Sequence, residues 1–291
     1  MKTSELFKRD RPVFSFEVFP PRNFDRPNAE KRVCATMEVL REVNPDFVSV
    51  TYRGAGPDAP KATIGIAKLI RDRYQTEAVV HLPAARLTKA DVDDFLVRAE
   101  DAGIQNILAL RGDIPEGGRV SDDFHYASDL VAYIKSKGDF NVSGACYPEG
   151  HPESPDALSD IRALKTKVDA GTSELISQLF FDNEAFFKFQ DRCQFAGINV
   201  PIEAGIMPIM TAAQAQRMQD MAGVNLPAKL QGVLHRFADK PDALRDAGIA
   251  YAVDQIVDLL AHGVDGIHLY TMDNPEVAAR IIEATKNIIR A

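Results

Sequence analysis

The sequence predicts a (β/α)₈ barrel, formed as a single domain over residues 1–291, and three observations favour this fold. Eight short apolar segments of strand character are each followed by helical sequence, at about 36 residues per unit. Strict alternation of strands and helices implies parallel strands that are joined by right-handed crossovers. No Gly-x-Gly-x-x-Gly motif follows the first strand, which weakens the competing interpretation, a doubly wound open sheet.

The strand segments are recognised by alternation of apolar and polar residues. In residues 13–19 one face is apolar, whereas Ser15 and Glu17 lie on the other, and two prolines follow. Residues 47–52 alternate in the same way and place Thr51 on their polar face. The remaining strands are expected at residues 78–82, 106–110, 142–147, 174–181, 202–209 and 266–271.

Helical segments fill the intervals between the strands. They are expected at residues 28–43, 60–74, 89–102, 126–136, 157–170, 183–196, 212–221, 244–262 and 275–289. Residues 114–123 are rich in Gly, Pro and Asp and are expected to form a loop. Residues 223–241 are expected to be an excursion from the barrel and not a domain.

Composition excludes several functional classes. The first twelve residues are charged and lack the apolar core of a secretory signal, and no apolar run is long enough to span a membrane. Three cysteines without metal-ligand spacing indicate a reducing, cytoplasmic setting. The net charge of −8 and the lack of a basic tract argue against nucleic-acid binding.

The carboxyl ends of barrel strands meet at one mouth, and polar residues occur at most of the predicted strand ends. These residues are Glu17, Thr51, His81, Arg111, Asp113, Tyr147, His151, Gln178, Tyr270 and Thr271. Arg111 and Asp113 flank Gly112, which allows backbone to approach a ligand or to turn sharply. The sequence has no Gly-x-Ser-x-Gly nucleophile motif and no lysine on a predicted strand, so neither a serine hydrolase nor a Schiff-base aldolase is supported.

Glu17 is the candidate general acid. Burial at a barrel mouth disfavours the ionised carboxylate and raises the pKa toward the range that is useful for proton donation. The alternatives are a buried ion pair or a position at a frayed strand edge. A second class of function, a metal-dependent barrel hydrolase, would use Glu17, His81, Asp113 and His151 as zinc ligands, although no short ligand pair such as His-x-His supports it.

Seven short motifs occur in order along the chain. They are residues 16–21 (FEVFPP), 49–52 (SVTY), 109–113 (ALRGD), 126–130 (YASDL), 147–152 (YPEGHP), 167–171 (KVDAG) and 178–182 (QLFFD). Together they resemble methylenetetrahydrofolate reductase in its bacterial single-domain form, from residue 14 to about residue 274. The resemblance implies a chain without the C-terminal regulatory domain of eukaryotic members.

The resemblance further implies a flavoenzyme. FAD would accept hydride from NADH or NADPH and pass it to 5,10-methylenetetrahydrofolate, giving 5-methyltetrahydrofolate by a ping-pong mechanism that could also run in reverse. Family members commonly form homo-oligomers, so self-association is expected. A third class of function, a folate-binding barrel without catalysis, would bind the pterin without hydride transfer.

The resemblance also assigns roles to individual residues. Glu17 would protonate the bridged folate, Asp113 would hydrogen-bond the pterin and favour a cationic iminium, and Gln178 and Tyr270 would contact the folate. The flavin-binding set would be Thr51, His81, Leu110, Arg111, Gly112, Asp113, Tyr126, Ala127, Tyr147, His151, Asp160 and Lys167.

Most of these residues also have a structural interpretation. Thr51 is a common strand residue, Asp113 could cap a turn, and backbone could satisfy the amide of Gln178. Asp160 and Lys167, seven apart on a helix, could form a solvated face.

The chain departs from the family pattern at a few positions. Pro83 stands two residues after His81, where family members often have Thr next to the His. Ala163 and Thr166 replace an Asn and an Arg of the flavin-side helix in some members, so adenosine and phosphate binding is expected to be built differently. Ala212 aligns with an aromatic residue that packs on the nicotinamide cofactor, and Asn274 aligns with an Arg.

Overall fold

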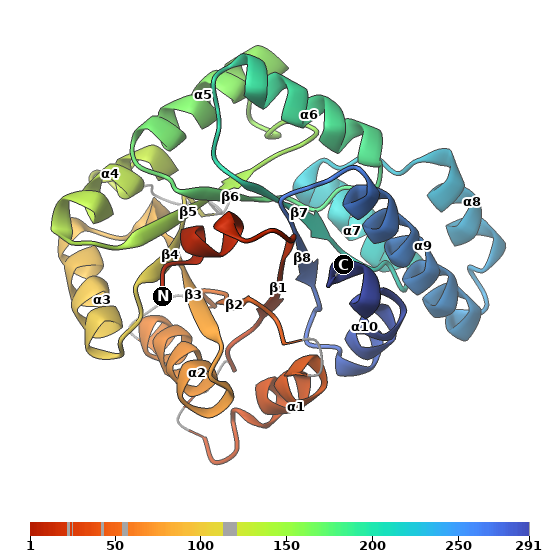
Figure 1. Ribbon diagram of the computed structural model, residues 1–291, viewed down its shortest axis with the longest axis horizontal. Helices are drawn as coiled ribbons and strands as arrows, with labels where there is room; N and C mark the ends of the chain where they lie inside the picture. Colours follow the sequence, from red (N-terminus) through yellow and green to blue (C-terminus); the bar gives the residue numbers. More distant parts are fainter. Residues whose placement is uncertain (22–23, 25, 42–43, 54–57, 113–120, 291) are drawn as a thin grey trace.

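The computed structural model describes residues 1–21, 24, 26–41, 44–53, 58–112 and 121–290. Eight parallel strands close into a barrel in sequence order, and helices surround it (Figure 1). The strands are β1 (Val13–Val18), β2 (Phe47–Val50), β3 (Glu77–Pro83), β4 (Asn106–Leu110), β5 (Asn141–Cys146), β6 (Glu174–Ser177), β7 (Ile202–Ile206) and β8 (Gly266–Tyr270). The α-helices are α1 (Lys31–Leu40), α2 (Asp58–Tyr74), α3 (Lys89–Asp101), α4 (Ala127–Lys137), α5 (Ala157–Asp169), α6 (Asn183–Phe195), α7 (Ala212–Ala222), α8 (Ala228–Arg236), α9 (Pro241–Ala261) and α10 (Pro275–Ile289). The predicted barrel is confirmed, and pairing of β1 with β8 excludes an open sheet.

The two faces of β1 separate the outer core from the barrel interior. Phe14, Phe16 and Val18 are at most 2% exposed and belong to the large apolar cluster that joins strands and helices. Ser15 and Glu17 lie on the other face, beside His268 and Tyr270 of β8 in the parallel register. The alternation in the sequence therefore separated correctly the two faces of β1, of which the one with Ser15 and Glu17 enters the barrel.

The amino-terminal end of the barrel is closed by a short 3₁₀ helix, η1 (Thr3–Lys8), which lies across the barrel centre in Figure 1. Leu6 packs in a small apolar cluster inside the barrel. The Thr3 hydroxyl donates to Glu174 Oε1 at 2.7 Å, and Asn141 Nδ2 donates to the same oxygen at 2.8 Å. With this end plugged by η1, the opposite end is where a ligand can enter.

Two strands end earlier than the sequence predicts. β6 ends at Ser177 and not at residue 181, and β7 ends at Ile206 and not at residue 209. The apolar residues that follow these strands, such as Leu179 and Ile209, belong to a second cluster. They continue the apolar run because they pack beneath the α7–α9 region, without belonging to the sheet.

Helix boundaries also differ from the expectation. The excursion at residues 223–241 contains α8, whose Leu230 and Leu234 face the second cluster, and α9 begins at Pro241 instead of residue 244. The first helix begins at Lys31 and not at residue 28, because Asn28 has a φ of 63°, which a right-handed helix does not allow.

Candidate active site

A cavity of about 1440 Å³ opens at the carboxyl ends of the strands. The predicted site residues that the structure describes all line it: Glu17, Thr51, His81, Leu110, Arg111, Gly112, Tyr126, Ala127, Tyr147, His151, Asp160, Lys167, Gln178 and Tyr270. Asp113, predicted as a cofactor and substrate contact, lies outside the described residues. The fold thus brings residues from seven strands or their loops and from two helices to one cavity.

Glu17 lines this cavity and is 8% exposed. Burial, and secondarily the charge of Asp273, raises the pKa of Glu17 to about 8. Its Oε2 is 3.7 Å from Nε2 of His81, whose pKa burial lowers to about 3. Both groups are therefore uncharged at neutral pH, and the pair is not an ion pair. The carboxyl of Glu17 holds a proton that it can donate.

Two polar atoms beside Glu17 are without hydrogen-bond partners among the described residues. Thr51 Oγ1 and His81 Nε2 are buried, and neither has a hydrogen-bond partner within the described part of the chain. Buried polar atoms in native proteins are normally hydrogen-bonded, so these two indicate the position of a polar ligand.

Two cationic side chains, those of Arg111 and Lys167, also line the cavity. Both terminal guanidinium nitrogens of Arg111 donate to Glu153, at 2.5 and 2.7 Å. Lys167 Nζ donates to the carbonyl oxygen of Ala145, and burial lowers the pKa of Lys167. Asp160 is 9% exposed, so it and Lys167 do not form the solvated helix face that was the alternative prediction.

The β5–α5 loop positions His151 next to these charges. Its Nδ1 accepts from the backbone N–H of Glu153 at 3.1 Å, and its ring lies edge-on to Tyr147 with centroids 4.6 Å apart. Asp160 Oδ1 accepts from the His151 backbone N–H at 3.2 Å and from Ser154 Oγ at 3.0 Å. Burial, and then the charge of Arg111, lowers the pKa of His151, which favours a neutral ring.

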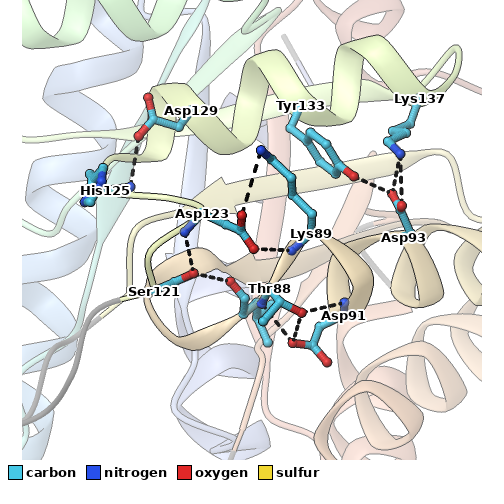
Figure 2. Close-up of polar contacts among 11 residues, drawn as sticks. Thr88, Lys89, Asp91, Asp93, Ser121, Asp123, His125, Asp129, Tyr133 and Lys137 are labelled. Carbon is cyan, nitrogen blue, oxygen red and sulfur yellow. Dashed lines mark hydrogen bonds and ion pairs between the residues drawn. The ribbon is translucent and has the colours of Figure 1, made fainter.

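The amino end of α4, which carries Tyr126 and Ala127 to the cavity rim, is held by polar contacts with the start of α3 (Figure 2). Asp123 Oδ2 accepts from the backbone N–H of Lys89 at 2.9 Å. Asp129 accepts from the backbone N–H groups of His125 and Tyr126, both at 2.9 Å. Tyr126 itself is 67% exposed, so its ring is available at the rim.

The side chains of Gln178 and Tyr270 each make a hydrogen bond to the backbone of the protein. Gln178 Oε1 accepts from the backbone N–H of Leu179 at 2.9 Å, as the structural interpretation suggested, although the residue also lines the cavity. The Tyr270 hydroxyl donates to the carbonyl oxygen of Ser177 at 2.7 Å. A Cβ on Gly205 would lie 2.7 Å from the Tyr270 ring, so the glycine makes room for it.

Sequence reasoning missed several cavity residues. His268 lies below Tyr270 on the same strand face, and its Nδ1 is 2.6 Å from Ser15 Oγ, which donates to Glu203. The period-two alternation of β8 could have identified it. Four of the seven methionines also line the cavity, and no sequence signal distinguished them: Met207, Met218, Met221 and Met272.

Some of the positions where the chain departs from the family pattern line the cavity, and others lie outside it. Ala163 and Thr166 line the cavity on α5, next to Lys167. Asn274 instead caps α10, where its side chain accepts from the backbone N–H of Val277 at 3.2 Å. Ala212 begins α7 and is exposed.

Gly112 is expected to be intolerant of substitution for two reasons. It has a φ of +84°, and an added Cβ would lie 2.7 Å from Cβ of Pro83. We expect Gly112→Ala to lower the free energy of unfolding by about 2 kcal/mol or more in urea denaturation. Gly150→Ala is the matched control, because Gly150 has a φ of +90° but no atom within 4 Å of the added Cβ. Equal losses in the two variants would contradict the close approach of Pro83.

Taken together, a closed parallel barrel with a buried, protonated acid in a large cavity at the carboxyl ends of its strands defines an enzyme of the (β/α)₈ class. Residues 2–286 match the family model described as methylenetetrahydrofolate reductase. The chain belongs to the methylenetetrahydrofolate reductase family and is therefore an oxidoreductase, which decides against the hydrolase alternative.

Relatives of known name support this assignment. The chain is 37% identical to the 5,10-methylenetetrahydrofolate reductase of Pectobacterium carotovorum subsp. carotovorum and 38% identical to that of Escherichia coli K12. Each match covers 92% of this chain and 88% of the relative. Methylenetetrahydrofolate reductase (NADH) 1 of Arabidopsis thaliana is 35% identical, over 97% of this chain and 49% of that protein.

Solved structures show the same fold at low identity. An uncharacterized protein from Clostridium thermocellum that binds two copies of 5-methyl-5,6,7,8-tetrahydrofolic acid superposes with a TM-score of 0.64, at 14% identity, over 100% of this chain and 99% of that one. A dihydropteroate synthase from Coxiella burnetii in complex with pteroic acid gives 0.53, at 14% identity, over 96% and 94%.

The described residues form neither a membrane-spanning helix nor a cluster of metal ligands. None of the helices within the described ranges has the length and apolar character needed to cross a membrane. Likewise, no group of three or more His, Cys, Asp or Glu side chains in the described part of the chain could hold a metal ion.

Proposed function

We propose that this reductase is FAD-dependent and transfers hydride from NADH or NADPH to 5,10-methylenetetrahydrofolate in two half-reactions that use the cavity in turn. The observation that carries the proposal is the protonated Glu17 inside the cavity, beside two buried polar atoms that have no hydrogen-bond partner among the described residues. A reduction that adds hydride to carbon and a proton to nitrogen needs such an acid.

The residues of the cavity fit FAD. The buried Thr51 hydroxyl and His81 Nε2 can hydrogen-bond the polar edge of a ring system, and the volume admits a dinucleotide together with a second ligand. Arg111 and Lys167 supply the cations that a pyrophosphate requires. When bound, FAD would supply the chemistry of hydride acceptance and donation.

The proposed roles of the protein groups follow from their positions. Glu17 donates its proton to a ring nitrogen of the bridged folate, which opens the bridge to an iminium, and it recovers a proton from solvent before the next turnover. The neutral His81 adds no positive charge that would oppose the iminium. Gln178 and Tyr270 contact the folate from the cavity wall. The methionine side chains can adapt to either of two flat ring ligands.

The cellular location of the protein is proposed as well. All three cysteines are free, which supports a cytoplasmic location. The chain is further proposed to fold as a single domain. It is also proposed to self-associate, and light scattering of the purified protein would test the self-association.

The test of the function is an anaerobic visible absorption spectrum of the purified protein. We expect a flavin band that bleaches with NADH and returns when 5,10-methylenetetrahydrofolate is added. Bleaching without return would remove the folate half-reaction. A colourless protein that takes up no added FAD would remove the flavin assignment.

A further inference from the structure

The segment after β8 holds the backbone that follows Glu17. Thr271 Oγ1 donates to the carbonyl oxygen of Glu17 at 2.9 Å. Asp273 Oδ1 accepts from the backbone N–H of Phe19 at 3.1 Å. These two contacts fix the two peptide groups that come directly after Glu17, at the point where β1 ends.

This segment has an unusual backbone. Met272 and Asp273 are consecutive non-glycine residues with φ of 51°, in the left-handed region. Such a conformation costs about 1–2 kcal/mol per residue and persists only where the surroundings enforce it. Here the Asn274 N–H donates to the Thr271 carbonyl at 3.0 Å, and Arg32 donates to the Asp273 carbonyl at 3.3 Å. Strain of this kind is found at functional sites.

Asp273 also brings a charge to Glu17. Its side chain is 7% exposed, and the charge is the second cause, after burial, of the raised pKa of Glu17. Arg32 Nε, on an exposed side chain, lies 3.8 Å from Asp273 Oδ2 and offsets this charge only in part. Arg53 also acts on Asp273, from the β2 side.

The other described titratable groups that face Glu17 are His81 from β3 and Tyr270 from β8. Burial lowers the pKa of His81 and raises that of Tyr270, so both are uncharged at neutral pH. Within the described part of the chain, therefore, Asp273 supplies the negative charge that acts on Glu17.

We propose that Asp273 is a positioning residue for the reaction: it fixes the backbone after Glu17 and holds a negative charge close to the Glu17 carboxyl. The inference rests on the proposed function of Glu17 as proton donor. Nothing in the sequence pattern singled out Asp273, which follows a strand end and adjoins Asn274.

The test separates the two contributions of Asp273. Asp273→Asn keeps an oxygen that can accept from Phe19 N–H but removes the charge. We expect Glu17 to lose its proton at lower pH, so that folate-dependent flavin reoxidation at pH 9 falls about fivefold while the rate at pH 6 is unchanged. Thr271→Val is the matched control, because it removes the other backbone contact without changing charge, and its pH profile should keep the midpoint of the native protein.

The protonation of Glu17 can also be measured in the resting protein, by following its carboxylic acid band in an infrared pH titration. The Glu17→Gln variant assigns the band, because it lacks this carboxyl group. A midpoint that is unchanged in Asp273→Asn would overturn the inference. A lowered midpoint supports it, even in a protein whose folate half-reaction fails, in which case only the proposed function is lost.

Discussion

Glu17→Gln is expected to stop folate reduction while leaving flavin reduction by NADH intact. The amide keeps the size of the side chain but cannot donate a proton from a carboxylic acid to the folate nitrogen. Loss of a positioned general acid lowers a rate by about 10²–10⁴-fold. Stopped-flow absorbance of each half-reaction measures the two steps separately. Glu184→Gln, an exposed carboxylate on α6, is the control and should leave both rates unchanged.

The assignment of Glu17 as the general acid also predicts how the rate of the folate half-reaction depends on pH. The acid form of Glu17 is the active form and its pKa is about 8, so the folate half-reaction should be constant at neutral pH and decline above about pH 8. A decline that is already complete by pH 6 would contradict the environment seen here.

The raised pKa also predicts a gain in stability for the variant. Because the folded-state pKa is above the unfolded value, the stability from Glu17 is full below the unfolded pKa, near 4.5, and is lost as pH rises toward 8. Glu17→Gln removes this cost and should be the more stable protein at pH 7, by up to a few kcal/mol in urea denaturation. A variant that is both inactive and less stable would instead indicate a packing defect.

The barrel and the position of the acid could be predicted because both depend on local patterns. Alternation in residues 13–19 placed Ser15 and Glu17 on the face opposite the apolar one, and a charged residue near a parallel strand's carboxyl end lies at the barrel mouth. Arg111 and Gly112 were located by the same reasoning.

What could not be predicted depends on contacts between distant segments. The ends of β6 and β7 were wrong because apolar residues that pack beneath α7–α9 look like continued strand. The role of Asp273 arises from left-handed backbone and from hydrogen bonds to residues about 250 positions away, such as Phe19. A helix pattern also could not show that Asp160 is buried, since that depends on the β5–α5 loop.

Gly248→Ala is expected to be the most destabilising of the substitutions considered. Gly248 lies in α9, and an added Cβ would lie 1.7 Å from the carbonyl oxygen of Ile209 and 2.8 Å from its carbonyl carbon. Both are backbone atoms, so a rotamer change cannot relieve the clash and α9 must move away from the segment after β7. We expect a loss of about 3 kcal/mol or more in urea denaturation, beyond the usual range for overpacking.

Gly232→Ala on α8 is the matched control for this substitution. No atom lies within 4 Å of its added Cβ, so only helix propensity should act, and the variant should gain up to about 1 kcal/mol. Opposite signs for the same chemical change in two helices would show that close packing of α9 on the chain after β7 decides the outcome. Equal stability of the two variants would mean that α9 does not approach Ile209 as described. Since Ile209 belongs to the same apolar cluster as the cavity residue Met207, a displaced α9 should also weaken ligand binding on that side of the cavity.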